Sequence, residues 1–146
     1  MLQLNRKTEY ALLSLEHIAR KGGDSERVSN TREISEAHHI PYPILGKVLQ
    51  KMASKGLIKS VQGINGGYVL ARKPEDLSVM DIIQIFDGKF AVVGCFKEGR
   101  CDCPQWKGCH IKDPLSELNH KIYRLIAQTK LSDLLSPPEK IERRSA

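Results

Sequence analysis

The side chains best suited to chemistry are the four cysteines of the chain, Cys95, Cys101, Cys103 and Cys109. A cluster this dense is typical either of a disulfide framework or of a metal or redox site. The first ten residues are polar and charged, and they lack the apolar run of a secretory signal. We therefore predict a cytoplasmic protein whose thiols stay reduced, and a cysteine cluster that binds metal or responds to redox conditions.

The spacing Cys95-x5-Cys101-x-Cys103-x5-Cys109 narrows the choice of metal. Thiolate sulfur suits both iron–sulfur clusters and zinc. Structural zinc usually takes pairs of cysteines separated by two residues, in knuckles far apart in the sequence, and this spacing lacks such pairs. The longer arms favour the wider reach of a [4Fe-4S] or [2Fe-2S] cluster. We rank that cluster first, structural zinc second, and a thiol–disulfide switch without metal third.

The composition predicts a globular protein with an anionic partner. The 146 residues carry a formal net charge of +6, and 40% of them are hydrophobic, so we expect one domain with a buried core. Aromatic residues make up only 5%, which argues against a protein that stacks single-stranded bases. No apolar run is long enough to span a membrane, and no nucleophile–base pair, phosphate loop or dinucleotide motif indicates an enzyme.

The elements that would position a DNA-reading surface begin with a helix at about residues 6–21, capped by Asn5. Asn30 begins a second, short helix, which ends before Pro41, and a third helix runs from Pro43 to Lys55. Lysines recur every four residues on its outer face, at Lys47, Lys51 and Lys55. A short helix, a tight turn and a longer helix with a basic outer face predict a helix-turn-helix.

Two strand-like runs, residues 57–61 and 68–71, follow the third helix directly. Three glycines between them permit positive backbone φ angles and a tight tip. A helix-turn-helix followed by a hairpin predicts a winged helix, in which the third helix enters the major groove and the hairpin contacts the minor groove or the backbone. The predicted DNA contacts are Tyr42, Ile44, Lys47, Lys51, Lys55, Lys59, Asn65, Gly66, Gly67 and Arg72.

A helix after the cysteines carries an apolar seam at heptad spacing, formed by Leu115, Leu118, Ile122 and Leu125. We predict that this helix joins two copies into a homodimer that matches a palindromic double-stranded DNA operator. The predicted fold is mainly α: a winged helix-turn-helix with a two-stranded wing at 1–88, a cysteine segment at 89–112, a dimerisation helix and terminal turn at 113–135, and a disordered tail at 136–146.

Three stretches resemble one family of regulators. They are Lys-Thr-Glu-Tyr-Ala-Leu at 7–12, Leu-Ile-Lys-Ser-Val-Gln-Gly at 57–63, and Gly-Gly-Tyr-Val-Leu-Ala-Arg-Lys-Pro at 66–74, and they resemble the winged-helix proteins that include IscR, NsrR and RirA. This resemblance implies a homodimeric transcription factor, usually a repressor, whose DNA affinity depends on a bound iron–sulfur cluster. The rival class, a cluster carrier that does not bind DNA, would explain the cysteines but not the wing or the lysine face.

The resemblance leaves the ligand set open. The family pattern has three cysteines about five residues apart, so either Cys101 or Cys103 is additional here. The ligand histidine of IscR-like proteins corresponds to Lys112, although His110 lies nearby. The acidic residue that reaches the partner subunit's cluster in NsrR-like proteins corresponds to Glu9. Ligation by all four cysteines is the third alternative.

Overall fold

The computed structural model describes residues 3–22, 27–96 and 103–136. The predicted fold class is confirmed, because the chain is mainly helical with one two-stranded antiparallel sheet. In order, the elements are α1 (Arg6–Gly22), α2 (Thr31–His38), α3 (Tyr42–Ser54), β1 (Ile58–Val61), β2 (Gly67–Leu70), η1 (Pro74–Asp76), α4 (Val79–Phe86), η2 (Gly94–Phe96), η3 (Trp106–Gly108), α5 (Lys112–Gln128) and α6 (Leu131–Leu135). No helix among the described residues is long and apolar enough to cross a membrane.

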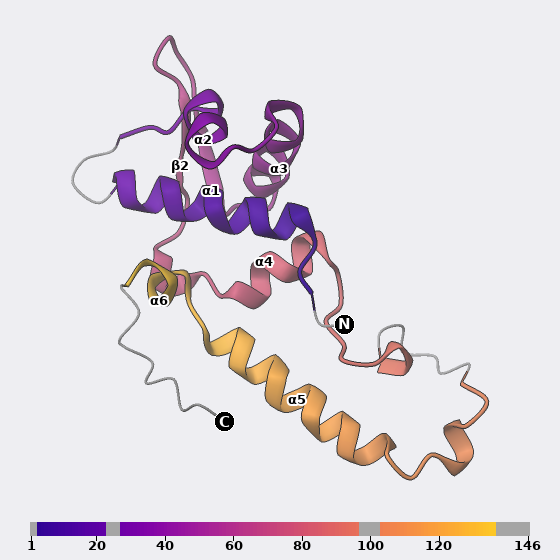
Figure 1. Cartoon of the computed structure of the whole chain (residues 1–146). Coiled ribbons are helices and arrows are strands. Elements are labelled where there is room, and N and C mark those ends of the chain that lie inside the picture. Colours follow the sequence, from indigo (N-terminus) through magenta and orange to yellow (C-terminus); the bar gives the residue numbers. More distant parts are fainter. Residues whose placement is uncertain (1–2, 23–26, 97–102, 137–146) are drawn as a thin grey trace, which may run out of the picture.

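Helix α1 lies at the centre of the molecule. Asn5 caps it by accepting a hydrogen bond from the Thr8 N–H at 2.9 Å. Helices α2 and α3 and the wing lie on one side of α1, and α4 lies on the other (Figure 1). The buried core joins these layers, with fully buried side chains that include Leu15 of α1, Leu49 of α3 and Ile82 of α4. Burial of this apolar surface is what stabilises the arrangement.

The helix-turn-helix consists of α2 and α3. Asn30 caps α2 through its side-chain oxygen, which accepts from the Glu33 N–H at 2.8 Å, and α2 ends at His38, directly before His39, whose φ of 52° is left-handed. Helix α3 buries an inward stripe of Leu45, Val48, Leu49 and Met52, as its sequence spacing predicts. The turn between the two helices therefore presents α3 with its polar face outward.

The wing is held by a third stretch of chain. Strands β1 and β2 pair from Ile58↔Leu70 to Val61↔Gly67, and Ser29 adds an isolated bridge to Tyr68 through backbone hydrogen bonds of 3.0 and 2.8 Å. A Cβ atom on Gly67 would lie 2.7 Å from the carbonyl carbon of Ser29, so this approach requires glycine. Of the three wing glycines, all of which are described, only Gly63 has a positive φ.

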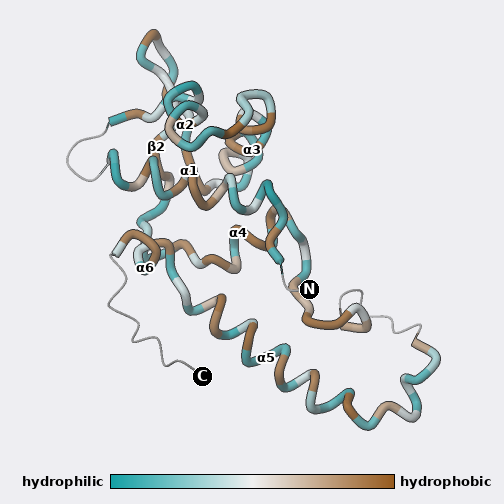
Figure 2. Tube along the Cα trace, viewed as in Figure 1, coloured by the Kyte–Doolittle hydropathy of each residue, from teal (hydrophilic) through white to brown (hydrophobic). Residues whose placement is uncertain are grey.

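The C-terminal elements leave the core and then return to it. A capping box of Ser78 and Asp81 begins α4. Helix α5 extends away beyond the end of α4, with polar and apolar residues alternating along it (Figures 1 and 2). The chain then returns at α6, where Leu131 is fully buried and its N–H donates to the Leu77 carbonyl at 2.8 Å. Helix α5 is therefore fixed to the core at its C-terminal end.

Candidate DNA-binding surface and cysteine segment

The recognition helix α3 presents the predicted residues to solvent. Tyr42 is 56% exposed and Ile44 is 41% exposed, and Lys47 is exposed in the middle of the outer face. Gly46 has no atom within 4 Å of the position that a Cβ would occupy. The N-terminal half of α3 is therefore open to solvent, and its side chains combine aromatic, aliphatic and basic groups.

Three of the predicted basic residues gather at the other end of α3. Lys51, Lys55 and Arg72 line one hollow of about 450 Å³, together with Asp81 and Gln84 of α4. The Lys51 ammonium lies 5.2 Å from the centroid of the Phe86 ring, which is a cation–π distance. Arg72 donates to the backbone oxygen of Asp76 at 2.6 Å. This hollow joins α3, the exit of the wing and α4 in one basic surface.

The predicted DNA contacts of the wing lie in two separate places. Asn65 is exposed at the tip, whereas Lys59 lines a separate hollow of about 560 Å³ between the wing and the C-terminal end of α1. The sequence prediction missed Ile64, which stands fully exposed beside Asn65. An apolar side chain flanked by glycines at a hairpin tip was the available signal, because minor-groove proteins often use such residues as wedges.

The cysteine segment lies outside the core. Cys95, Cys103 and Cys109 are free and half-buried, and Cys101 lies outside the described residues. The Cys103 thiol donates to the Gln105 side-chain oxygen at 3.1 Å. Within the described part of the chain, the structure does not bring three His, Cys, Asp or Glu side chains together as a metal site. His110 is exposed next to Cys109, and the Lys112 ammonium lies 4.8 Å from the Trp106 ring centroid.

The start of this segment is tied to the N-terminal end of α1. Asn5 donates to the Phe86 carbonyl at 3.1 Å, and the Thr8 hydroxyl donates to the Asp87 carboxylate at 2.6 Å. Glu9 follows Thr8 and pairs with Arg6 at 3.1 Å, on the helix turn that meets the end of α4. The junction between α4 and the cysteine segment therefore contacts α1 directly, and through Phe86 it also contacts α3.

Helix α5, described along its whole length, has no buried residue. Of the predicted seam, Leu118 is 43% exposed and Leu125 is 66% exposed, while Leu115 and Ile122 are half-buried. The Gln84 side chain of α4 donates to the Tyr123 hydroxyl at 3.3 Å, which fixes the side of α5 that faces the core. The exposed leucines leave an apolar stripe uncovered in the single chain.

Comparison with known proteins decides the family. The model of the Rrf2 family, described as iron-dependent transcriptional regulators, matches residues 4–137. The chain belongs to the Rrf2 family. The resemblance predicted from the sequence is confirmed, and so is the expectation that the protein is not an enzyme. This Rrf2 protein is a transcriptional regulator that binds DNA through a winged helix.

The sequences of individual relatives align with nearly the whole of this chain. The regulator NsrR of Halalkalibacterium halodurans is 28% identical over 141 residues, covering 97% of this chain and 95% of the relative. Protein rrf2 of Nitratidesulfovibrio vulgaris is 30% identical over 134 residues, covering 92% and 87%. Among solved structures, CymR of B. subtilis, the global cysteine regulator, superposes with a TM-score of 0.74 at 25% identity, covering 92% of this chain and 97% of that one. T. potens IscR gives 0.69 at 26% identity, covering 92% and 86%.

Proposed function

We propose that this Rrf2 regulator binds a palindromic operator as a homodimer, and that the chemical state of its cysteine segment sets the affinity for that operator. One observation carries the proposal: the cysteine segment connects α4, which contacts the recognition helix, to α5, the predicted dimerisation helix. It begins at the end of α4, whose Phe86 contacts the recognition helix, and it ends at α5, whose apolar stripe is uncovered. A change in the segment would therefore act on DNA reading and on dimer geometry together.

The cysteine thiols are the type of ligand that iron–sulfur clusters use. Three of them, among the described residues, are free and half-buried and lie outside the hydrophobic core, so the packing of the core does not depend on them. Cys95 and Cys109 would hold the cluster with Cys101, Cys103 or both, and Glu9 or His110 are the alternative further ligands. When bound, the cluster would supply iron–thiolate bonds that respond to iron supply and oxidation. NsrR and IscR relatives, together with the iron-dependent description of the family, support this choice.

The side chains of this protein supply the route from the segment to the DNA-reading surface. Asn5 and Thr8 hold the junction of α4 and the segment against α1 through two hydrogen bonds. Phe86, the last residue of α4, holds Lys51 of α3 over its ring. A displacement of the junction would therefore move a basic side chain of the recognition helix, as the energetic coupling of two sites requires.

Dimerisation supplies the second half of the proposal. Pairing the exposed stripe of α5 with its copy would bury Leu118 and Leu125 around a two-fold axis. The two recognition helices would then read half-sites about one helical turn apart, roughly 34–36 Å along the duplex.

Anaerobic purification tests the cofactor and the coupling in one preparation. Iron and acid-labile sulfide should be present in cluster stoichiometry, and removing the cluster should change operator affinity about 5- to 150-fold, the range of typical allosteric coupling. Fluorescence anisotropy with an operator fragment from the gene's own promoter measures the affinity, and sedimentation velocity measures the dimer. Equal affinity of the loaded and the empty protein would overturn the proposed control.

A thiol–disulfide switch is the second candidate, favoured by the similarity to CymR of B. subtilis, the global cysteine regulator, and by the free Cys95, Cys103 and Cys109. Under this alternative, oxidation would change operator affinity in a protein that contains no iron, and dithiothreitol would restore it. Structural zinc, the third possibility, would give a colourless protein with stoichiometric zinc.

A further inference from the structure

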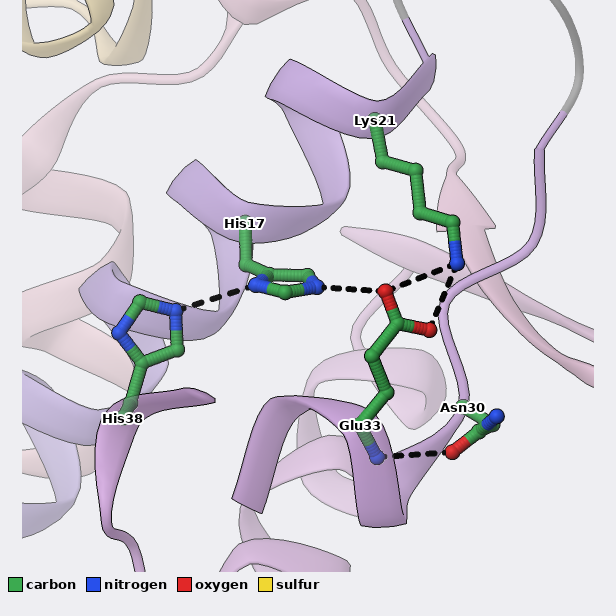
Figure 3. Close-up of polar contacts among 5 residues, drawn as sticks. All are labelled: His17, Lys21, Asn30, Glu33 and His38. Atoms are coloured by element: carbon green, nitrogen blue, oxygen red, sulfur yellow. Dashed lines mark hydrogen bonds and ion pairs between the residues drawn. The ribbon is translucent and has the colours of Figure 1, made fainter. Parts of the chain in front are cut away.

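Two histidines face each other across the contact between α1 and α2 (Figure 3). The Nδ1 atom of His17 and the Nε2 atom of His38 are 3.2 Å apart. Their rings lie edge to face, with centroids 5.2 Å apart and planes at 76°. One ring nitrogen of each side chain therefore points toward a shared region between the helices.

The second nitrogen of His17 is fixed by a carboxylate. His17 Nε2 lies 3.0 Å from Oε1 of Glu33, and Lys21 holds both oxygens of the same carboxylate at 2.8 and 2.6 Å (Figure 3). With Nε2–H donating to Glu33, Nδ1 of His17 is the nitrogen that carries a lone pair, and this lone pair is directed at His38. Metal-binding histidines are oriented in the same manner by a carboxylate on the far nitrogen.

We propose that His17 and His38 together bind a divalent transition-metal ion of the zinc class. Zinc–nitrogen bonds of about 2.0–2.1 Å at a tetrahedral angle hold two ligand nitrogens about 3.3–3.4 Å apart. The observed separation of 3.2 Å is shorter than this by only one or two tenths of an ångström. To meet at one tetrahedral ion, each lone pair would have to turn by about 35° from the line that joins the two nitrogens.

The fixed charges around the pair balance. A hollow of about 530 Å³ beside the pair is lined by Glu16, Arg20 and Lys21 as well as by Glu33 and the histidines. Each basic residue there is matched by a carboxylate, because Arg20 pairs with Glu16 and Lys21 pairs with Glu33. Within the described part of the chain no third metal-binding side chain converges on the pair, so the hollow leaves the remaining coordination positions to water.

The ion would fasten two elements that the DNA-reading surface depends on. His38 is the last residue of α2, directly before the left-handed His39 and the turn that leads to α3. His17 lies on the central helix α1. Metal at this position would hold the first helix of the helix-turn-helix against α1. The site contains no cysteine, so it can be tested independently of the proposed control by the cysteine segment.

Zinc titration of a full-length chain carrying Cys95→Ser, Cys101→Ser, Cys103→Ser and Cys109→Ser tests the site without competition from thiols. Calorimetry should show one zinc ion per chain. His17→Gln or His38→Gln in this background should weaken binding at least tenfold, whereas His120→Gln, an exposed histidine on α5, should leave it unchanged. Glu33→Gln keeps both ligands and removes the orienting carboxylate, so it should weaken binding about 10- to 100-fold.

A second measurement on the same cysteine-free chain needs no histidine variant. Zinc should shift the ring ¹⁵N signals of His17 Nδ1 and His38 Nε2 together. Absence of zinc binding, equal binding in the His38→Gln chain, or shifts confined to other nitrogens would each overturn the site and leave the two histidines as hydrogen-bonding partners only.

Discussion

Replacing Leu125 with alanine tests whether the exposed stripe of α5 is the dimer interface. Leu125 is 66% exposed in the single chain, and α5 buries none of its described residues, so the substitution leaves the core intact. Alanine is a strong helix former, which keeps the helix itself stable. Any loss of dimer would therefore report the interface rather than the fold.

The expected size of the effect follows from the exposed fraction. Full burial of a leucine side chain contributes about 1.5–3 kcal/mol, so a residue that is 66% exposed can gain about 1–2 kcal/mol on dimerisation. Alanine retains part of this gain, which leaves a loss of about 0.7–1.5 kcal/mol per copy. The residue occurs twice in a two-fold interface, so the total loss is about 1.4–3 kcal/mol, or a dimer dissociation constant about 10- to 150-fold higher.

Sedimentation equilibrium over a range of concentrations measures this constant. Leu134→Ala is the matched control, because Leu134 is an exposed leucine, at 44%, on α6 and outside the seam. The control chain should dimerise like the wild type. An unchanged constant for Leu125→Ala, or an equal loss in the control, would refute the placement of the interface on α5.

Three further predictions concern the DNA-binding unit. Lys47→Ala should weaken operator binding about tenfold and reduce the slope of log affinity against log salt by about 1, as measured by anisotropy, and an unchanged affinity would count against α3 as the reading helix. Gly67→Ala should lower the free energy of unfolding in urea by about 1–3 kcal/mol, because the new methyl group would collide with Ser29. Gly46→Ala, which meets no atom within 4 Å, should instead raise it by up to about 1 kcal/mol, so equal effects of the two changes would contradict this account. The pKa of His38 is lowered in the folded state, so its contribution to stability is present above pH 6.5 and is lost as the pH falls through the folded pKa; urea unfolding should follow this course, and His38→Gln should remove that part of the dependence.

Local signals in the sequence were enough to predict most of the fold. The caps at Asn5 and Asn30 were both predicted, because each side chain bonds a backbone N–H only three residues away. The inward stripe of α3 was predicted because helical periodicity repeats within the element. Such features depend on neighbours in the sequence, and tertiary contacts reinforce them.

Features that depend on distant residues could not be predicted. The bridge between Ser29 and Tyr68 explains why Gly67 is glycine, whereas the sequence suggested a positive φ there. A glutamate three residues after the cap Asn30 is typical of a capping box, but only the Asn30 half forms, because the Glu33 carboxylate binds Lys21 and His17 of α1 instead. A long side chain near two cations follows the stronger electrostatic partners.

Hydrophobic periodicity also misplaced one side of α1. Helical spacing places Leu13 on the apolar face of this helix, yet its side chain is 39% exposed, whereas Thr8 and Ser14 are fully buried. Both hydroxyls find partners inside, Thr8 at Asp87 and Ser14 at the Tyr10 carbonyl, so their burial leaves no hydroxyl unsatisfied. The ligand set of the cysteines stays a prediction, because Cys101 lies outside the described residues. The predicted disordered tail also lies outside them from residue 137 to residue 146.

The attachment of α5 to α4 through Tyr123 leaves the N-terminal part of the helix free to amplify small changes. The Lys112 end lies 11 residues, or about 16 Å, from Tyr123, which Gln84 of α4 bonds. A rotation of one degree about Tyr123 displaces the far end by about 0.3 Å. A change in the segment that ends at Lys112 that rotates α5 by several degrees would thus move the paired ends of two copies by about an ångström or more, and shift the two recognition helices relative to a fixed helical repeat.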